Sequence, residues 1–413
     1  GGECSSSGAG FTSVDYETLY DVLCAQLPSE PSVLLLYQLL HSNRAFVRYV
    51  LTRTDVDVVL MPLLRGVYGT ATAKAPPPAR MYMLLIVLLI LSQDSAFVAA
   101  AFAMQLPRVP WFRERLLGQI SVGSLAVCVL CRLVHANLNS SARRDPYVST
   151  NCLAALANMA GSYRALHPYA ALSLVSLYAR LAKRHSKLSA RAEELLRSQS
   201  AAAAAGDVLI SAGETAVELT QLNAEQNACA DSMRISLEII NAALSGPSLA
   251  HNAHLVYSLL ERQALFTEQH PAHALLGDAL ANVQVVIAHF GSRLSSIDGA
   301  LTAAEATLPT TTAEAAASTQ NATVLTVEKV MTMIDDAARE WRPSSLRQLD
   351  ELRFTYEQEE DAEEFFTPYL WALVTDVTNL VESYEEEMRE APLLAGQPQS
   401  QPERELHVEA AVA

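Results

Sequence analysis

The sequence predicts an all-α protein built as an α-solenoid-like stack of antiparallel helical pairs. Apolar residues recur at helical spacing along most of the 413 residues, and the alternation typical of strands is nearly absent. Half of the residues are hydrophobic and 18% are charged, which favours a folded chain over a disordered one. Because the predicted helices are more numerous than one bundle core normally uses, a stack of helical pairs is favoured over a compact bundle.

The N-terminal part is predicted to hold short helices whose limits are marked by proline. They are expected at residues 15–27, 33–40, 43–51, 56–64 and 80–91. Pro28 stops the first helix and Pro31 opens the second, because proline is tolerated at the first position of a helix but not in its interior. Residues 69–78 include three consecutive prolines and predict a loop. Leu84 and Leu88 are expected to be buried, since the last of these helices is apolar on every side.

The middle of the chain is predicted to hold longer helices. We expect them at residues 111–138, 151–159, 163–182 and 188–198. Leu153 and Leu156 share one helical face, where small alanines permit close approach of a neighbouring helix, so both leucines are expected to be buried. Five consecutive alanines follow at 201–205 and supply no packing face. Residues 198–206 are therefore interpreted as an insertion or linker.

The C-terminal part returns to the helical pattern. Helices are expected at residues 214–244, 254–266, 272–290, 324–338 and 365–384. Residues 300–322 are rich in Ala and Thr and are interpreted as a second low-complexity loop. We therefore predict a disordered start at 1–13, one helical domain at 14–390 with low-complexity insertions near 198–212 and 300–322, and a disordered tail at 391–413.

The apolar stretches of the chain are predicted to be core helices. The longest run, residues 81–91, has eleven residues, whereas a helix that spans a bilayer needs about 20. A second stretch at 123–130 is closed by Cys131 and Arg132. The first ten residues lack the charged and apolar regions of a signal peptide, so the six cysteines are expected in a reducing compartment.

Charge is distributed unevenly along the chain, whose formal net charge is −16. Residues 108–191 hold twelve Lys and Arg against two acidic residues, and residues 341–390 hold four Arg against fourteen. The basic block lacks the interleaved aromatic residues of a nucleic-acid-binding surface, so nucleic acid is not a predicted partner. The acidic run at 357–364 lacks the ligand pattern and glycine of a calcium loop and is predicted to be solvated.

Two histidine pairs are the candidates for chemistry. His251 and His254 are three residues apart, as are His270 and His273, a spacing that can place two imidazoles on one helical face. Pro271 interrupts the second pair, and no carboxylate or cysteine completes either set nearby. The motifs of serine and cysteine nucleophiles are missing. The sequence therefore predicts no catalytic residue, no metal site and no cofactor, while a helical enzyme or ligand carrier with an unrecognised site near these pairs stays open as the alternative.

Several stretches resemble the dymeclin family. The most specific is Thr-Asn-Cys-Leu-Ala-Ala-Leu-Ala-Asn-Met at 150–159. The others are Val-Leu-Leu-Leu-Tyr-Gln-Leu-Leu-His at 33–41, Tyr-Val-Leu-Thr-Arg-Thr-Asp at 49–55, Leu-Glu-Ile-Ile-Asn at 237–241, Leu-Val-Tyr-Ser-Leu-Leu at 255–260 and Glu-Glu-Phe-Phe-Thr-Pro-Tyr-Leu-Trp at 363–371. The family has a long further N-terminal portion, so we expect this chain to be a C-terminal fragment.

The resemblance implies a cytoplasmic protein, peripheral on Golgi membranes, without catalytic activity. It would support Golgi organisation and vesicle traffic between the endoplasmic reticulum and the Golgi, with Golgi or trafficking proteins as partners. The resemblance also implies a myristoylated glycine in the portion that precedes this chain, and the similar pattern at residues 1–5 is interpreted as coincidental.

A single acyl chain binds membranes only marginally, so a second membrane contact is expected. We predict that it is supplied by the basic residues Arg143, Arg144, Lys183, Arg184 and Lys187. These residues would contact anionic headgroups or an acidic partner. The alternative is that they solvate helix ends or face the acidic run at 357–364 of the same chain.

Overall fold

The computed structural model is all-α, which confirms the predicted fold class. It describes residues 14–27, 29–72, 79–139, 144–204, 211–306, 327–342, 346–358, 363–364 and 366–375. The predicted disordered ends, 1–13 and 391–413, lie outside these residues. The chain divides into two compact units, Gly1–Glu357 and Gln358–Ala413, and the described part of the second is helical at 363–364 and 366–375. The solenoid-like arrangement of helical pairs stays a prediction.

The first six helices confirm the predicted N-terminal pattern and add one helix to it. They are α1 (Tyr16–Gln26), α2 (Glu30–Ser42), α3 (Arg44–Leu51), α4 (Asp57–Thr72), α5 (Ala79–Ser92) and α6 (Ser95–Ala103). Asp15, Asn43 and Asp94 cap α1, α3 and α6, since their side chains accept hydrogen bonds from backbone N–H groups of the first turn. The loop was expected at residues 69–78, but α4 continues to Thr72, so the first four of these residues are helical.

The helix predicted at 111–138 is wrong over its first part. Strands β1 (Gln105–Arg108) and β2 (Gly118–Ser121) form an antiparallel pair, and α7 begins only at Val122 and ends at Asn139. Tertiary contacts override helix propensity here, because the rings of Trp111 and Phe112 pack on Tyr68, with centroid distances of 5.4 and 5.0 Å. Within the described residues this pair is the whole of the sheet structure.

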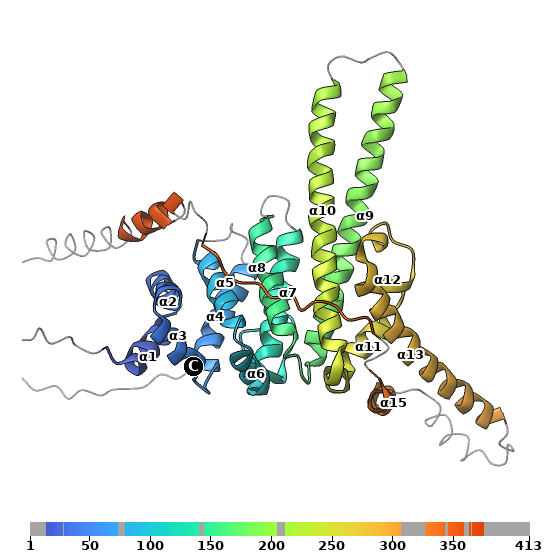
Figure 1. Cartoon of the computed structure of the whole chain (residues 1–413), viewed down its shortest axis with the longest axis horizontal. Coiled ribbons are helices and arrows are strands. Elements are labelled where there is room, and N and C mark those ends of the chain that lie inside the picture. Colours follow the sequence, from blue (N-terminus) through green and yellow to red (C-terminus); the bar gives the residue numbers. More distant parts are fainter. Residues whose placement is uncertain are drawn as a thin grey trace, which may run out of the picture. The chain divides into compact units, whose positions relative to one another are not determined.

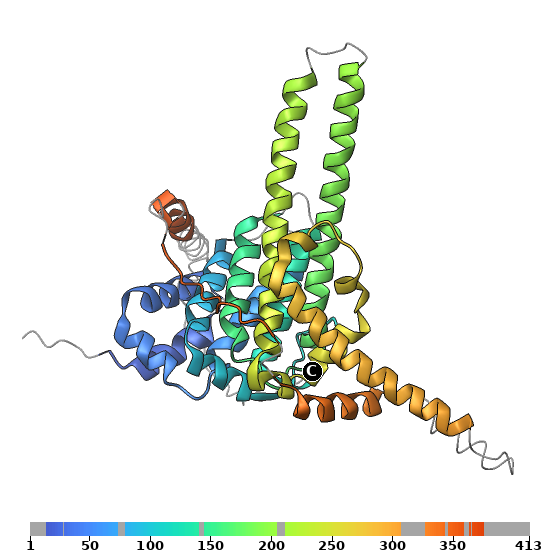
Figure 2. The same cartoon turned by 45° about the vertical axis from the view of Figure 1, so that its right-hand side comes forward.

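Helices α8 (Pro146–Ala160), α9 (Pro168–Ala204) and α10 (Ser211–Leu244) form the centre of the first unit. The two helices predicted at 163–182 and 188–198 are one helix, because nothing between them breaks the pattern. Residues 198–204, interpreted as linker, also continue α9, as their alanines favour helix. Figures 1 and 2 show α9 and α10 side by side, with their distal ends extending beyond the neighbouring helices.

The remaining elements in the described part of the first unit are η1 (Gly246–His251), α11 (Ala253–Glu261), α12 (Ala264–Thr267), α13 (His273–Ala306) and α15 (Val327–Glu340). The helix predicted at 254–266 is thus divided into α11 and α12. Helix α13 kinks at Gly277, whose φ of 45° is tolerated because glycine lacks a Cβ. It continues to Ala306, so the loop expected at 300–322 is helical at its start, while residues 307–326 lie outside the described part.

The core follows the predicted apolar faces. The four leucines chosen from the sequence are all buried, with Leu84 1%, Leu88 5%, Leu153 2% and Leu156 0% exposed. Helix α7 packs against α4, α8 and α9. Gly123 permits its close approach to α6, since a Cβ there would lie 2.7 Å from the ring of Phe102.

Two helices of the described part are long and apolar enough to cross a membrane, by length and composition alone. They are α7 and the His273–Ser295 part of α13, and the bent pair α5 and α6 would make a third. The apolar stretch taken from the sequence, residues 123–130, is shorter than the 18-residue helix α7 that contains it. Neighbouring elements bury 72% of α7 and 44% of the α13 window, so packing within the unit accounts for the apolar character of α7.

Residues 346–357, which we call the strap, follow α15 and form neither helix nor strand. The strap crosses the surface of α13, α8 and α2 (Figures 1 and 2), where it hydrogen-bonds to Asn282, Asn158 and Tyr37. These three residues are far apart in the sequence, so the strap connects distant parts of the first unit.

Candidate functional site

The predicted basic contact lies around the middle of α9 and the start of α8. Arg144 and Arg184 both face Glu225 of α10, at 3.2 and 2.7 Å. Burial, followed by the proximity of Arg144, lowers the pKa of Arg184. Lys183 and Lys187 are exposed. Arg143 lies outside the described residues.

The basic cluster contains two arginines that are paired with Glu225 and two lysines that are exposed. Arg144 and Arg184 share this carboxylate and thereby join the start of α8 and the middle of α9 to α10. The two lysines are exposed on α9, so they carry the positive charge that another molecule can reach. The sequence did not single out Glu225, because its contact with Arg144 and Arg184 depends on how the helices pack.

The structure brings His270 and His273 together and adds His185 from α9. The ring centroids of His185 and His270 are 5.4 Å apart, and those of His270 and His273 are 5.3 Å apart. The N–H of Ala272 donates to His270 Nδ1, which assigns the proton to Nε2. Nε2 lies 3.0 Å from the carbonyl oxygen of Ala182, so both nitrogens of His270 are engaged.

The surroundings of this histidine cluster disfavour the charged form of two of its members. Burial lowers the pKa of His185 and of His273, and the proximity of His270 lowers both further. Within the described part of the chain, no three His, Cys, Asp or Glu side chains are arranged to hold a metal ion.

The other candidate pair, His251 and His254, does not come together as a site. His251 ends η1 and is exposed, whereas His254 is half-buried on α11. Burial lowers the pKa of His254, and Asp335 of α15 opposes this shift. The spacing of three residues was therefore a weak indicator here, because a helix boundary separates the two residues.

The five described cysteines are free and buried, as expected for small apolar side chains. Burial raises the pKa of Cys131 to about 12 and that of Cys128 well above its usual range. A thiol with a raised pKa is protonated at neutral pH and is a poor nucleophile. The spacing of three residues between Cys128 and Cys131 therefore places both thiols on one buried face of α7.

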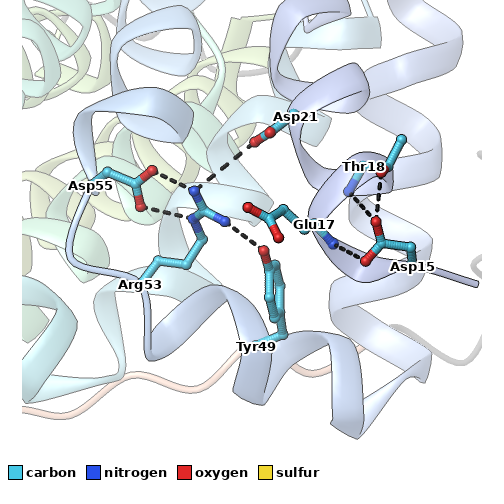
Figure 3. A network of polar contacts seen from close by, with 7 residues as sticks. All are labelled: Asp15, Glu17, Thr18, Asp21, Tyr49, Arg53 and Asp55. Carbon is cyan, nitrogen blue, oxygen red and sulfur yellow. Dashed lines mark hydrogen bonds and ion pairs between the residues drawn. The ribbon is translucent and has the colours of Figure 1, made fainter.

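An arginine network occupies the segment at 49–55 that resembles the dymeclin family (Figure 3). Arg53 donates to both carboxylate oxygens of Asp55, at 2.7 and 2.5 Å, and to the hydroxyl of Tyr49. Its guanidinium lies 4.6 Å from the ring centroid of Tyr20 and 4.0 Å from the carboxylate of Asp21, both on α1. The network fixes the turn after α3 against α1, and the hydrogen bonds from Arg53 lower the pKa of Asp55.

A cavity of about 820 Å³ lies beside the end of α4 and the segment before β2. On its wall, the hydroxyl of Tyr68 donates to Glu114 at 2.7 Å, and Arg132 donates to the other oxygen of Glu114 at 2.5 Å. Tyr68 also accepts the backbone N–H of Arg113. Because these polar groups satisfy one another, the wall is a closed hydrogen-bonded cluster and not a nucleophile with its base.

Sequence reasoning missed a set of asparagines that join separate segments. Asn158, Asn252 and Asn282 each direct the side-chain amide to backbone groups of a distant segment. The sequence could have indicated two of them, because asparagine is unfavourable inside a helix. Asn158 and Asn282 nevertheless lie inside α8 and α13.

These contacts define an all-α protein whose organised polar groups hold its own segments together. A model of the family described as "Dymeclin: Dyggve-Melchior-Clausen syndrome protein" matches residues 3–373. The chain belongs to the dymeclin family, which confirms the resemblance read from the sequence.

Individual relatives show the same similarity. A protein named Dymeclin from Gallus gallus is 36% identical over 370 residues, which cover 90% of this chain and 49% of that protein. Dymeclin from Drosophila melanogaster is 33% identical over 367 residues, covering 89% and 47%. The chain thus spans about half the length of these relatives, and no solved structure matches it.

Proposed function

We propose that this protein is a non-enzymatic scaffold, cytoplasmic and peripheral on Golgi membranes, that supports Golgi organisation and vesicle traffic between the endoplasmic reticulum and the Golgi. The observation that carries the proposal is membership of the dymeclin family across residues 3–373. The all-α build is compatible with a scaffold, because helical surfaces offer extended contact areas to other proteins.

The test uses the full-length protein, since this chain covers about half of its relatives. Cells depleted of the protein should show a fragmented Golgi and slower transport of a synchronised secretory cargo from the endoplasmic reticulum. Re-expression of the full-length protein should restore both, and an alkaline carbonate wash should release it from Golgi membranes. A normal Golgi and normal cargo transport after complete depletion would refute the proposal.

The exposed lysines of α9 are our proposed second contact with the membrane. Lys183 and Lys187 are exposed, whereas Arg184 and Arg144 are engaged with Glu225. A basic residue near an anionic surface contributes about 1 kcal/mol, so two lysines contribute about 2 kcal/mol, which corresponds to about thirtyfold in binding.

The variant Lys183→Gln/Lys187→Gln tests this contact without breaking the pairs to Glu225. Binding to vesicles that contain phosphatidylserine should fall by about thirtyfold at low salt, and binding to neutral vesicles should not change. Arg191→Gln/Arg197→Gln is the matched control, because it removes two positive charges further along the same helix. Equal losses in both variants would reject a specific contact and indicate a general effect of charge.

A further inference from the structure

Two asparagines hold the backbone of the strap to the helices, in addition to an ion pair between the side chains of Arg347 and Asp278. Asn282 of α13 donates to the carbonyl oxygen of Arg347 at 2.9 Å and accepts the N–H of the same residue at 2.8 Å. Asn158 of α8 binds Phe354 in the same way, at 2.9 and 2.8 Å. A primary amide offers both donors and an acceptor, so each asparagine satisfies both polar backbone groups of one strap residue.

The side chains of the strap are only partly buried. Leu352, Phe354 and Tyr356 are half-buried, while Arg353 and Thr355 between them are exposed. This alternation is typical of an extended segment that lies with one side against a surface. The hydroxyl of Tyr356 lies 3.1 Å from that of Tyr37 on α2. None of the residues 346–357 reaches the burial of the core, so this segment is held less firmly than the helices beneath it.

The strap also leaves the surface beneath it incompletely filled. A cavity of about 750 Å³ lies between strap residues 346–352 and the helices α8, α10 and α13. Asn241 of α10 lines it and is 4% exposed. The amide nitrogen of Asn241 donates to the carbonyl oxygens of Leu237 and Ala279, but its Oδ1 is buried without a hydrogen-bond partner. A buried acceptor that lacks a donor is a position that a backbone N–H of a larger occupant can satisfy.

We propose that this surface of α8, α10 and α13, which we call the asparagine groove, is a peptide-binding groove, and that the strap exchanges with an extended segment of a partner protein. Asn158 and Asn282 contact only the main chain of the strap, so they place no demand on the sequence of the occupant. Specificity comes from the half-buried positions, where the partner segment carries apolar or aromatic residues at every second position.

A fluorescent peptide with the sequence of residues 346–357 is the probe for exchange. In the parent chain the strap competes with the peptide, so binding measured by fluorescence anisotropy should be weak. Phe354→Ser/Tyr356→Ser in the chain loosens the strap without changing the groove, and the peptide should then bind at least tenfold more tightly. Addition of Asn158→Ala/Asn282→Ala should abolish this gain in affinity, because both asparagines lose their hydrogen bonds to the peptide backbone.

Controls separate loss of the groove from loss of the fold. Asn223→Ala/Asn227→Ala, at exposed positions of α10, should leave peptide binding unchanged, and circular dichroism should show the same helix content in every variant. A peptide of the same composition in scrambled order, with the apolar alternation removed, should bind at least tenfold more weakly. Equal affinity of the parent and the strap variant, or binding that survives loss of both asparagines, would overturn the proposal.

Two further measurements can contradict the exchange directly. In the parent, the N–H groups of Arg347 and Phe354 should exchange with deuterium faster than those of α8, because the strap opens without unfolding the helix. Equal protection of strap and helix would mean that the strap does not open by itself. Dimers that form through exchanged straps, seen by size-exclusion chromatography, would assign the groove to a second copy and not to a partner protein.

Discussion

Replacement of Asn252 by alanine should remove one of the most connected side chains in the protein. Asn252 is 1% exposed and lies between η1 and α11. Its amide nitrogen lies 3.0 Å from the carbonyl oxygen of Tyr163, 3.2 Å from that of Ala243 and 3.0 Å from that of Ser248. Its oxygen accepts the N–H of Leu166 at 3.3 Å. One side chain therefore connects the loop between α8 and α9 to the end of α10.

The cost of Asn252→Ala can be worked out from the groups that lose their partners. Each buried polar group without a hydrogen bond costs about 1–3 kcal/mol. The N–H of Leu166, a residue that is 1% exposed, is one such group, and the carbonyl oxygen of Tyr163 is the second. We therefore expect a loss of roughly 2–6 kcal/mol, which corresponds to a fall in Tm of roughly 2–7 °C for a chain of this size.

Thermal unfolding followed by circular dichroism measures this loss, and hydrogen exchange locates it. The N–H of Leu166 should lose protection in Asn252→Ala while amides in the middle of α7 keep theirs. Asn227→Ala is the control, because this asparagine is exposed on α10 and should change Tm by less than about 1 °C. A similarly small change for Asn252→Ala, with the Leu166 amide still protected, would refute the reasoning.

Three further perturbations have defined outcomes. Gly123→Ala should destabilise the chain by about 1–3 kcal/mol in urea unfolding, because the new methyl group would lie 2.7 Å from Phe102. Burial, with two nearby arginines, lowers the pKa of His135 to about 3, so the unfolded chain binds this proton first as pH falls below about 6.5. The contribution of His135 to stability should fall by about 1.4 kcal/mol per pH unit between about pH 6.5 and pH 3, and His135→Phe should remove this part of the pH dependence. Arg53→Lys should cost about 1 kcal/mol through loss of the two-bond contact with Asp55, and the loss should be much smaller when Asp55 is already alanine.

The helices could be predicted where the apolar pattern alone decides the structure. Leu84 and Leu153 lie on faces that the sequence marks as apolar, and both are buried. The prediction failed at residues 111–121, where the rings of Trp111 and Phe112 find a partner in Tyr68, more than forty positions earlier, and β2 pairs with β1. Such a contact is set by tertiary packing and leaves no periodic signal in the local sequence.

In the candidate site, too, the contacts that depend on tertiary packing could not be predicted from the sequence. The spacing of His270 and His273 predicts that their rings are neighbours, and they are. His185 joins them only because α9 packs beside the segment before α13, and nothing in the sequence near residue 185 indicates this. The basic residues of α9 were also recognisable, whereas the carboxylate that engages Arg184 was not.

Asparagines inside helices offer a signal that the periodicity of apolar residues lacks. Asn158 and Asn282 weaken their own helices, since asparagine is less favourable there than leucine by roughly 0.4 kcal/mol. Both direct their amides to the strap and not to solvent. In Asn158→Leu, α8 should therefore become intrinsically more stable while Phe354 loses both backbone hydrogen bonds. Helix stability and strap attachment then change in opposite directions, so protection of the α8 amides should be retained while that of the Phe354 amide is lost.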